Sequence, residues 1–311
     1  MQIDQNRIPF RCPTCRGETY RTFLNKLSDV GCGLPGEWDL LECLQCGLIF
    51  TVPPLEPDQF EDYYPAQYSS YNPTGALRST TVGGLIRRIA MLPYTWRFGS
   101  PTWGERPFGS GQLLDVGCGA GMFLMEAAKL GWHVWGIDLS SLAVEKARIN
   151  APTASIRLGQ LEDLQPNEMF DMINLSHVLE HLPEPHQALR LCFEHLAPGG
   201  KLRICIPNIG SLEARLFGRA WRGLDPPRHA VHFRPKVIER LLQECGFAQV
   251  SIRPQMFASF ISESIILLLP NGRQLFGSRV ARLLYLAMVL PASLSYMLGN
   301  ADAIELTAHK P

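Results

Sequence analysis

The stretch LLDVGCGAGMFL, residues 113–124, decides the fold of this chain of 311 residues. A short apolar run ends in three alternating glycines, Gly117, Gly119 and Gly121, and passes directly into helix-forming residues. Without side chains the backbone can press against a ligand, and the start of a helix presents free N–H groups to it. The spacing is G-x-G-x-G, whereas a dinucleotide fingerprint places its third glycine one residue later. The pattern predicts a cofactor loop and argues against a nicotinamide oxidoreductase.

Short apolar strands alternate with amphipathic helical stretches from residue 112 onward, which is typical of a doubly wound α/β fold with a parallel sheet. The predicted strands are 112–117, 133–138, 154–160, the first half of 170–182, 201–208, 249–253 and 303–310. The predicted helices are 122–131, 141–150, 185–200 and 235–247, some of which end on a capping glycine.

Asp138 ends the second predicted strand, 17 residues after Gly121. A carboxylate at this place can accept hydrogen bonds from both hydroxyls of a ribose. The alternative is that Asp138 only caps the following helix. We favour ribose binding because strand, loop and acid occur together in this order.

With these motifs in order, residues 108–255 resemble the class I S-adenosylmethionine-dependent methyltransferases. FDMINLSHVLEHL (170–182) is similar to the family's fourth strand and its "vLEHl" signature, and LAPGGKLRICIPN matches the segment leading into the fifth strand. The resemblance implies a Rossmann-like sheet that binds S-adenosylmethionine. It assigns the methionine part of this cofactor to Asp115, Gly117, Gly119 and Gly121, the ribose to Asp138, the adenine surroundings to Gln160, Leu161 and Glu162, and a further cofactor contact to Ser176.

A hydroxyl acceptor needs a base, and a neutral imidazole near pH 7 suits proton removal. The histidines near the expected methyl group are His177, His181, His229 and His232. We expect His229 to be the base and place His181 second, because a histidine of the LEH signature more often orients its loop. A metal on His177 and His181 is disfavoured, since H-x-x-E-H metalloprotease sites need a further carboxylate in another helical context.

The loop WRGLDPPRHAVHF (221–233) follows the fifth strand, where substrate-binding segments of this family lie. We expect Trp221 to contact the substrate and Arg228 to bind an anionic group on it bidentately. The alternative is a rigid loop in which Asp225 and Arg228 pair with each other. DPPR resembles the D-P-P-Y of amino-methylating enzymes, but it follows the wrong strand and lacks the aromatic residue.

Two C-x-x-C pairs near the N-terminus, Cys12 with Cys15 and Cys43 with Cys46, are separated by 27 residues. This spacing predicts a ribbon with a closed, four-thiolate structural Zn²⁺ site. The odd total of nine cysteines argues against a disulfide framework. Zinc ribbons often bind nucleic acids, but the net charge of +0 makes nucleic acid a disfavoured partner.

A zinc ribbon followed by CGLIFTVPPLEP and YYPAQY resembles a bacterial subset of these methyltransferases, which act on sugars or belong to polysaccharide and natural-product pathways. The resemblance places Tyr64 and Tyr68 in the substrate cleft, and the alternative is a packing strap. The long C-terminal domain of the sugar C-methylating members is missing, which favours a hydroxyl acceptor. We therefore expect O-methylation of a sugar, a glycan or a related small molecule. A noncatalytic adaptor and a quinone- or natural-product-type O-methyltransferase are the alternatives.

We divide the chain into a ribbon with a Tyr-rich strap (1–75), a connector (76–110) and a methyltransferase domain (111–311) with an apolar helical insertion at 256–299. The uncharged run 283–298 contains Pro291 and is shorter than the roughly 20 residues of a spanning helix, so we do not expect a transmembrane anchor. A packed cap or dimer interface and a peripheral membrane contact, with arginines at the headgroups, both stay open. No signal peptide is recognisable, so we expect a cytoplasmic protein, in the second case at the inner membrane.

Overall fold

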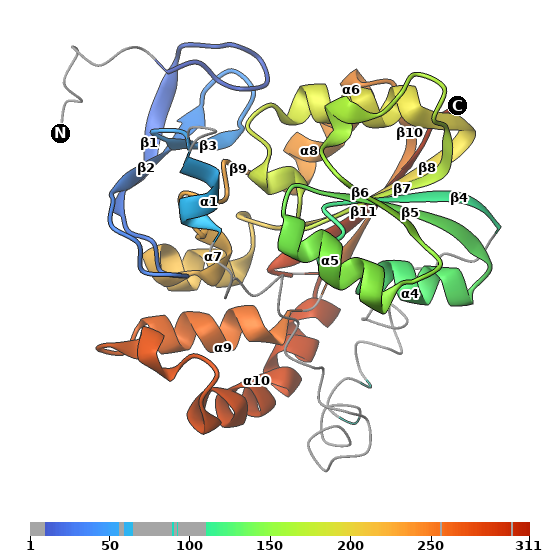
Figure 1. The fold of residues 1–311 in the computed structure, drawn as a ribbon. Coiled ribbons are helices and arrows are strands. Elements are labelled where there is room, and N and C mark those ends of the chain that lie inside the picture. Colours follow the sequence, from blue (N-terminus) through green and yellow to red (C-terminus); the bar gives the residue numbers. More distant parts are fainter. Residues whose placement is uncertain are drawn as a thin grey trace.

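The computed structural model describes residues 10–55, 59–64, 89, 92, 110–255, 257–299 and 301–311. Its centre is a seven-stranded sheet with the order β6-β5-β4-β7-β8-β11-β10 (Figure 1). β11 runs antiparallel to both of its neighbours, and the other pairs are parallel. The predicted Rossmann-like fold is confirmed. The strands are β4 (Gly111–Val116), β5 (Trp132–Asp138), β6 (Ser155–Leu158), β7 (Phe170–Ser176), β8 (Leu196–Pro207), β10 (Ala248–Gln255) and β11 (Ala303–His309).

Helices cover both faces of this sheet, with α4 and α5 on one side and α6 and α8 on the other (Figure 1). Side chains alternate along each strand. Leu113 and Met172 pack with α4 and α5, while their neighbours Leu114 and Ile173 join the core under α6 and α8. The bounds are α4 (Met122–Lys129), α5 (Ser141–Asn150), α6 (Pro185–His195) and α8 (Pro235–Glu244), with the shorter α1 (Phe60–Tyr63) and α7 (Leu212–Phe217) and the 3-10 turns η3 (Leu161–Asp163), η4 (Leu179–His181), η5 (Gly218–Ala220), η6 (Arg222–Leu224) and η7 (Gly272–Leu275).

Most predicted elements end within three residues of their predicted bounds, and the largest difference lies at the end of α6. The sequence extended the third predicted helix through residue 200 and began the next strand at residue 201, whereas α6 ends at His195 and β8 begins at Leu196. The backbone of Gly199 and Gly200 bonds to Lys310 near the end of the chain. This partner lies more than 100 residues away, so no local pattern indicates it.

The N-terminal residues form a second, antiparallel sheet with the order β1-β2-β3-β9. Three of its strands come from the ribbon, but β9 comes from the loop that carries His229. Ile49 and Phe50 of β3 pair with His232 and Val231. The ribbon and the loop 221–233 therefore share one sheet. The bounds are β1 (Tyr20–Leu27), β2 (Trp38–Cys43), β3 (Ile49–Val52) and β9 (Val231–His232).

The ribbon brings its two cysteine pairs together, as the spacing predicted. One ligand atom from each of Cys12, Cys15, Cys43 and Cys46 lies within 4.8 Å of the others. Two equivalent turns hold them: the backbone N–H of Arg16 donates to the carbonyl of Cys12, and that of Gly47 to the carbonyl of Cys43, both at 2.9 Å. The cluster therefore presents four sulfur atoms to a common centre.

Residues 257–299 are helical, as expected, and form the pair α9 (Ala258–Leu267) and α10 (Arg279–Met297), drawn below the sheets in Figure 1. Buried Val289, Ala292 and Tyr296 of α10 pack against Ala258 and Ile261 of α9. α10 continues through Pro291. By length and composition alone, α10 could cross a membrane. Of its most apolar stretch of 18 residues, 22% is buried in the protein.

We expect Gly121→Ala to destabilise the fold more than Gly199→Ala. Both glycines have similar positive φ values, 77° and 76°, so alanine is strained at each by about 1–2 kcal/mol. A Cβ at residue 121 also lies 2.9 Å from the Cα of Ala147 in α5, whereas nothing lies within 4 Å of one at residue 199. The clash should add about 1–3 kcal/mol, measured by urea unfolding. Equal losses in the two variants would contradict this packing argument.

Candidate active site

The glycine loop lies at the carboxyl edge of the parallel strands, between β4 and α4. Gly117, Gly119 and Gly121 all have positive φ, at 63°, 51° and 77°. Gly121 occupies the cap position of α4, and no side chain of the described residues caps that helix start. The N-terminus of α4 therefore lies at this edge, where helix N–H groups suit a polar or anionic ligand.

Asp138 closes the neighbouring strand and binds the loop. Its carboxylate accepts hydrogen bonds from the backbone N–H of Gly119 at 2.8 Å and from that of Ser140 at 2.9 Å. Burial raises the pKa of this carboxyl. Ser140, rather than Asp138, caps α5, because its hydroxyl accepts from the N–H of Ala143. The role of helix cap, which the sequence left open for Asp138, thus falls to Ser140.

Asp115 begins a chain of polar side chains that crosses five adjacent strands inside the sheet. Asn174 donates to Asp115 at 2.6 Å and accepts from Arg203 at 2.7 Å, and Arg203 in turn pairs with Glu305. Gln255 of β10 donates to the same glutamate at 3.0 Å. Sequence reasoning named only Asp115. The visible signal for the others was a polar or charged residue inside an otherwise apolar strand.

The residues predicted near the adenine follow β6 at the same edge. Gln160 is the cap of a 3-10 turn, in which Leu161 is buried and Glu162 is exposed. Ser176 ends β7, which β4 and β5 separate from β6. Since the carboxyl ends of parallel strands lie at one edge, all the predicted cofactor residues come from strand ends and the loops after them at that edge.

The loop after β7 packs directly on the glycine loop. A Cβ added at Gly117 would lie 2.6 Å from the side chain of Val178, so any larger residue there would displace this loop. Its first residue, His177, has a positive φ of 56°, a conformation that non-glycine residues rarely adopt and that recurs at functional sites. The cofactor loop and the LEH turn are therefore one packed unit.

Glu180 is buried beneath this turn, and its carboxylate lies 3.2 Å from Nδ1 of His177. Burial alone would raise the pKa of Glu180, but the hydrogen bond and charge of His177 hold it at about 2. Burial likewise would lower the pKa of His177, but Cys205 and Glu180 raise it above its ordinary value. Glu180 and His177 thus form a charged pair at neutral pH.

His181 and His229 are neutral in contrast. Burial lowers the pKa of both rings, in His229 to about 4. Nδ1 of His181 lies 2.9 Å from the carbonyl of Arg228, and Nδ1 of His229 lies 2.9 Å from the carbonyl of Gly223. A carbonyl only accepts, so each Nδ1 carries the hydrogen and each Nε2 keeps its lone pair.

Three acceptor groups therefore converge beside the cofactor loop. One ligand atom each of Glu180, His181 and His229 lies within 4.8 Å of the others, and the two imidazole centroids are 4.7 Å apart. Within the described part of the chain, Oε2 of Glu180 has no hydrogen-bond partner. This arrangement can accept the proton of a bound hydroxyl group. His232, the fourth candidate, is buried behind His229, and burial lowers its pKa to about 3.

The sequence predicts that Arg228 binds the substrate, but in the structure its side chain does not face an open cleft. Its guanidinium is buried, with 1% of the residue exposed, and donates to Asp225 at 2.7 Å and to Asp29 of the ribbon at 2.5 Å. The pairing with Asp225 is the alternative that the sequence left open. Asp29, 199 residues away, was not foreseen. Arg228 therefore connects the loop 221–233 to the ribbon.

Trp221 also differs from its predicted role. It is 1% exposed and packs in an apolar cluster with Leu27, Leu40 and Ile49 of the ribbon. A buried indole of this kind holds the loop against the ribbon and offers almost no surface to a ligand. Tyr64 does lie at the site, with its hydroxyl 2.9 Å from Nδ1 of His181. Tyr68 lies outside the described residues.

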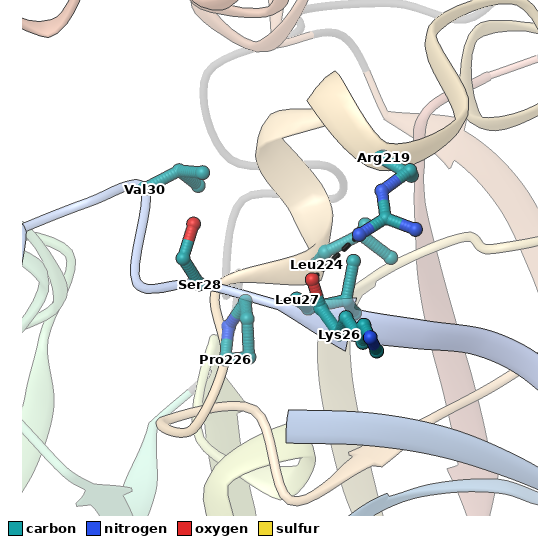
Figure 2. A pocket seen from close by; sticks show the side chains of 7 residues that line it. All are labelled: Lys26, Leu27, Ser28, Val30, Arg219, Leu224 and Pro226. Atoms are coloured by element: carbon teal, nitrogen blue, oxygen red, sulfur yellow. Dashed lines mark hydrogen bonds between the residues drawn. The ribbon is translucent and has the colours of Figure 1, made fainter. Parts of the chain in front are cut away.

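A cavity of about 130 Å³ lies between the ribbon and the loop that follows β8. Figure 2 shows its lining, with the Arg219 guanidinium bonded to the carbonyl of Lys26. None of the predicted cofactor or catalytic residues lines this cavity. The lining residues are Lys26, Leu27, Ser28, Val30, Arg219, Leu224 and Pro226.

Residues 93–252, about half of the chain, match the family model described as "Methyltransferase domain". The chain belongs to the class I S-adenosylmethionine-dependent methyltransferases. The matched region contains the glycine loop, Asp138 and both neutral histidines.

Curated relatives of this methyltransferase include ubiquinone biosynthesis O-methyltransferases. The protein of that name from Maricaulis maris (strain MCS10) is 36% identical over 158 residues, which are 47% of this chain and 62% of the relative. That from Xanthomonas oryzae pv. oryzae (strain PXO99A) is 38% identical over 103 residues, 31% of this chain and 43% of the relative. The chain thus matches less than two thirds of these relatives.

Solved structures resemble the methyltransferase at lower identity. A possible histamine N-methyltransferase from Thermotoga maritima has a TM-score of 0.48 at 17% identity, over 73% of this chain and 92% of that one. An N-methyltransferase from Bradyrhizobium japonicum, solved with S-adenosyl-l-homocysteine, has a TM-score of 0.45 at 16% identity, over 81% of this chain and 100% of that one.

The protonation of Asp115 should make stability depend on pH. Burial raises its pKa from 3.8 to about 7, so the folded state holds a proton that the unfolded state releases above pH 4. The contribution to stability is therefore present at low pH and is lost as the pH rises toward 7. Between pH 5 and pH 7, the unfolding free energy of the wild type should fall by roughly 2 kcal/mol relative to Asp115→Asn, as measured by urea unfolding. Parallel pH profiles would show that Asp115 is ionised throughout.

Proposed function

We propose that the protein transfers a methyl group from S-adenosylmethionine to a hydroxyl group of a small-molecule acceptor. The observation that carries this proposal is the pair of neutral histidines, with buried Glu180, packed against the glycine loop. Transfer to an oxygen is a displacement at an activated sulfonium, which needs alignment and a base for the hydroxyl proton. An adaptor without activity would not need lone pairs held at this position.

The residues at the carboxyl edge fit the cofactor. The uncapped start of α4 and the three glycines suit its methionine part, and buried Asp115 lies on the strand leading into them. The carboxylate of Asp138 is placed for the ribose hydroxyls at the end of β5. When bound, S-adenosylmethionine supplies the methyl group, and the chain orients it toward the acceptor.

We assign the role of general base to His181 and make His229 the second candidate. The sequence alone favours the opposite order. His229 is only 6% exposed, whereas His181 is partly exposed at the turn after β7. A general base must come within hydrogen-bond distance of the proton that it removes. Nε2 of His181 takes the hydroxyl proton in the proposed reaction, while the carbonyl of Arg228 holds its ring through Nδ1.

We favour an aromatic hydroxyl as the acceptor. Phe257 and Phe260 flank His177, with ring centroids at 4.8 and 6.3 Å, and they give the site an aromatic wall suited to a planar ring. The names of the curated relatives point the same way. A sugar or glycan hydroxyl, our expectation from sequence, remains the second acceptor class. Labelled methyl transfer to catechols and to free and nucleotide-linked sugars distinguishes the two.

We also propose that the four cysteines hold Zn²⁺. Two of the sulfur pairs are 3.4 and 3.5 Å apart, and all lie within 4.8 Å. Tetrahedral zinc with Zn–S bonds of about 2.3 Å needs sulfur atoms roughly 3.8 Å apart, so the cluster fits this ion. Four thiolates leave no open position, and the role of the ion is to hold the ribbon.

Replacement of the base should reduce turnover while cofactor binding is kept. We expect His181→Ala to lower kcat on the order of 10²–10⁴-fold, because the hydroxyl proton then has no acceptor. Calorimetric affinity for S-adenosylmethionine should stay near that of the wild type, and His133→Ala, exposed on β5, serves as the control. A large loss in His229→Ala alone would return the role to His229. Full activity in both variants would exclude this mechanism.

Metal analysis of the purified protein tests whether the four cysteines of the ribbon hold zinc. The purified protein should contain about one zinc ion per chain, and Cys43→Ser should lose it and lower the unfolding temperature. Cys32→Ser is the matched control, since Cys32 lies outside the four-sulfur cluster. Zinc retained at full occupancy by Cys43→Ser would show that the ion is held elsewhere.

A further inference from the structure

The outer face of α10 carries a continuous apolar stripe. Its exposed apolar residues recur at steps of three and four, which places them within an arc of about 80° on the helix. The side opposite this stripe packs on α9. The stripe consists of Val280, Leu283, Ala287, Leu290, Leu294 and Leu298, of which the five larger ones are 53%, 69%, 47%, 51% and 87% exposed. Exposed apolar surface of this extent marks an interaction site.

The charge around this stripe has one sign. From residue 264 to residue 301 the sequence contains no Asp or Glu, and its charged residues are Arg273, Arg279 and Arg282. Arg273 donates to the carbonyl of Asp29. Arg279 and Arg282 are exposed, and no ion pair joins them to another residue in the described ranges.

Both free arginines stand in the first turn of α10, where the helix dipole disfavours positive charge. Nothing within the described part of the protein offsets this placement. An anionic partner at the start of the helix would offset the unfavourable interaction of the two arginines with the helix dipole. The partner must therefore combine negative charge near residues 279–282 with an apolar region along residues 283–298.

A second copy of this helix does not have that combination. Two α10 helices side by side in parallel would bring like charges together. An antiparallel pair would set each arginine against the uncharged C-terminal half of the other helix. An anionic phospholipid bilayer offers phosphates at its surface and acyl chains below them, which is the required order.

We propose that the outer face of α10 binds the protein to the surface of an anionic phospholipid membrane. The helix lies along the interface, with Arg279 and Arg282 at the headgroups and the leucine stripe in the acyl boundary. On the other side of the pair, α9 has Phe257 at its N-cap and Phe260 in its first turn, and the rings of both contact His177. The membrane face and the histidine site thus lie at one helical pair, which suits an acceptor held in the bilayer. This last point rests on the proposed function, whereas membrane binding does not.

Co-sedimentation of the full-length protein with vesicles tests the proposal without cofactor or acceptor. We expect binding to phosphatidylcholine vesicles that contain phosphatidylglycerol and much weaker binding to phosphatidylcholine alone. Leu290→Glu and Leu294→Glu should each weaken binding by about tenfold or more. The double variant Arg279→Gln and Arg282→Gln should lose most of the preference for anionic lipid, by about fivefold per arginine. Ile149→Glu, at a residue of α5 that is 78% exposed, should bind like the wild type.

Several results would overturn the proposal. These are no binding to anionic vesicles, undiminished binding by the leucine variants, or a dimer in analytical ultracentrifugation that Leu290→Glu dissociates and that does not bind vesicles. The far-ultraviolet circular dichroism of each variant shows that α10 is still formed. Methyl transfer is measured separately, so a failure of membrane binding is distinguishable from a failure of the proposed enzyme activity.

Discussion

The buried guanidinium of Arg228, held between Asp225 and Asp29, is the interaction on which the arrangement of the site depends. It joins the loop after β8 to the ribbon in a place that excludes water, where an unpaired charge would be strongly unfavourable. The space is filled so closely that a Cβ at Gly31 would lie 2.6 Å from the guanidinium. The backbone carbonyl of the same arginine fixes the ring of His181. One residue thus sets both the position of the ribbon and the orientation of the proposed base.

Around this link, the protein separates charged from neutral groups over a short distance. Glu180 and His177 are ionised partners, whereas His181 and His229 beside them are kept neutral by burial. Environments that shift the pKa values of neighbouring titratable groups in opposite directions are a common basis of acid–base roles in enzymes. Within the sheet, the polar chain from Asp115 to Gln255 links each side chain to one on the next strand. Of its buried side-chain atoms in the described residues, Nε of Arg203 has no hydrogen-bond partner.

Sequence spacing predicted those parts of the site whose residues are neighbours in the chain. The glycine loop, Asp138 and the two cysteine pairs are local patterns. Strand alternation predicted the strand ends at which the loop and Asp138 lie, and the C-x-x-C spacing predicted the cysteine cluster. Arg228 and Trp221 were assigned to the substrate because a polar, Trp-containing loop after the fifth strand looks exposed. Their partners, Asp29 and Leu27, lie about 200 residues earlier, and only the ribbon sheet brings them close. Nor does a sequence show which ring nitrogen carries the hydrogen, since the deciding carbonyls of Arg228 and Gly223 belong to the folded loop.

The pairing of β3 with β9 has a consequence for how the chain folds as it is synthesised. Phe50 and its partner Val231 are 181 residues apart, so β3 remains an open sheet edge while the whole cofactor-binding half is made. An open edge with apolar side chains invites pairing with another chain. Contacts between such distant residues also close late, because the entropy of a long loop must be overcome first. The ribbon, although it is synthesised before the methyltransferase domain, completes its sheet only after that domain has supplied β9.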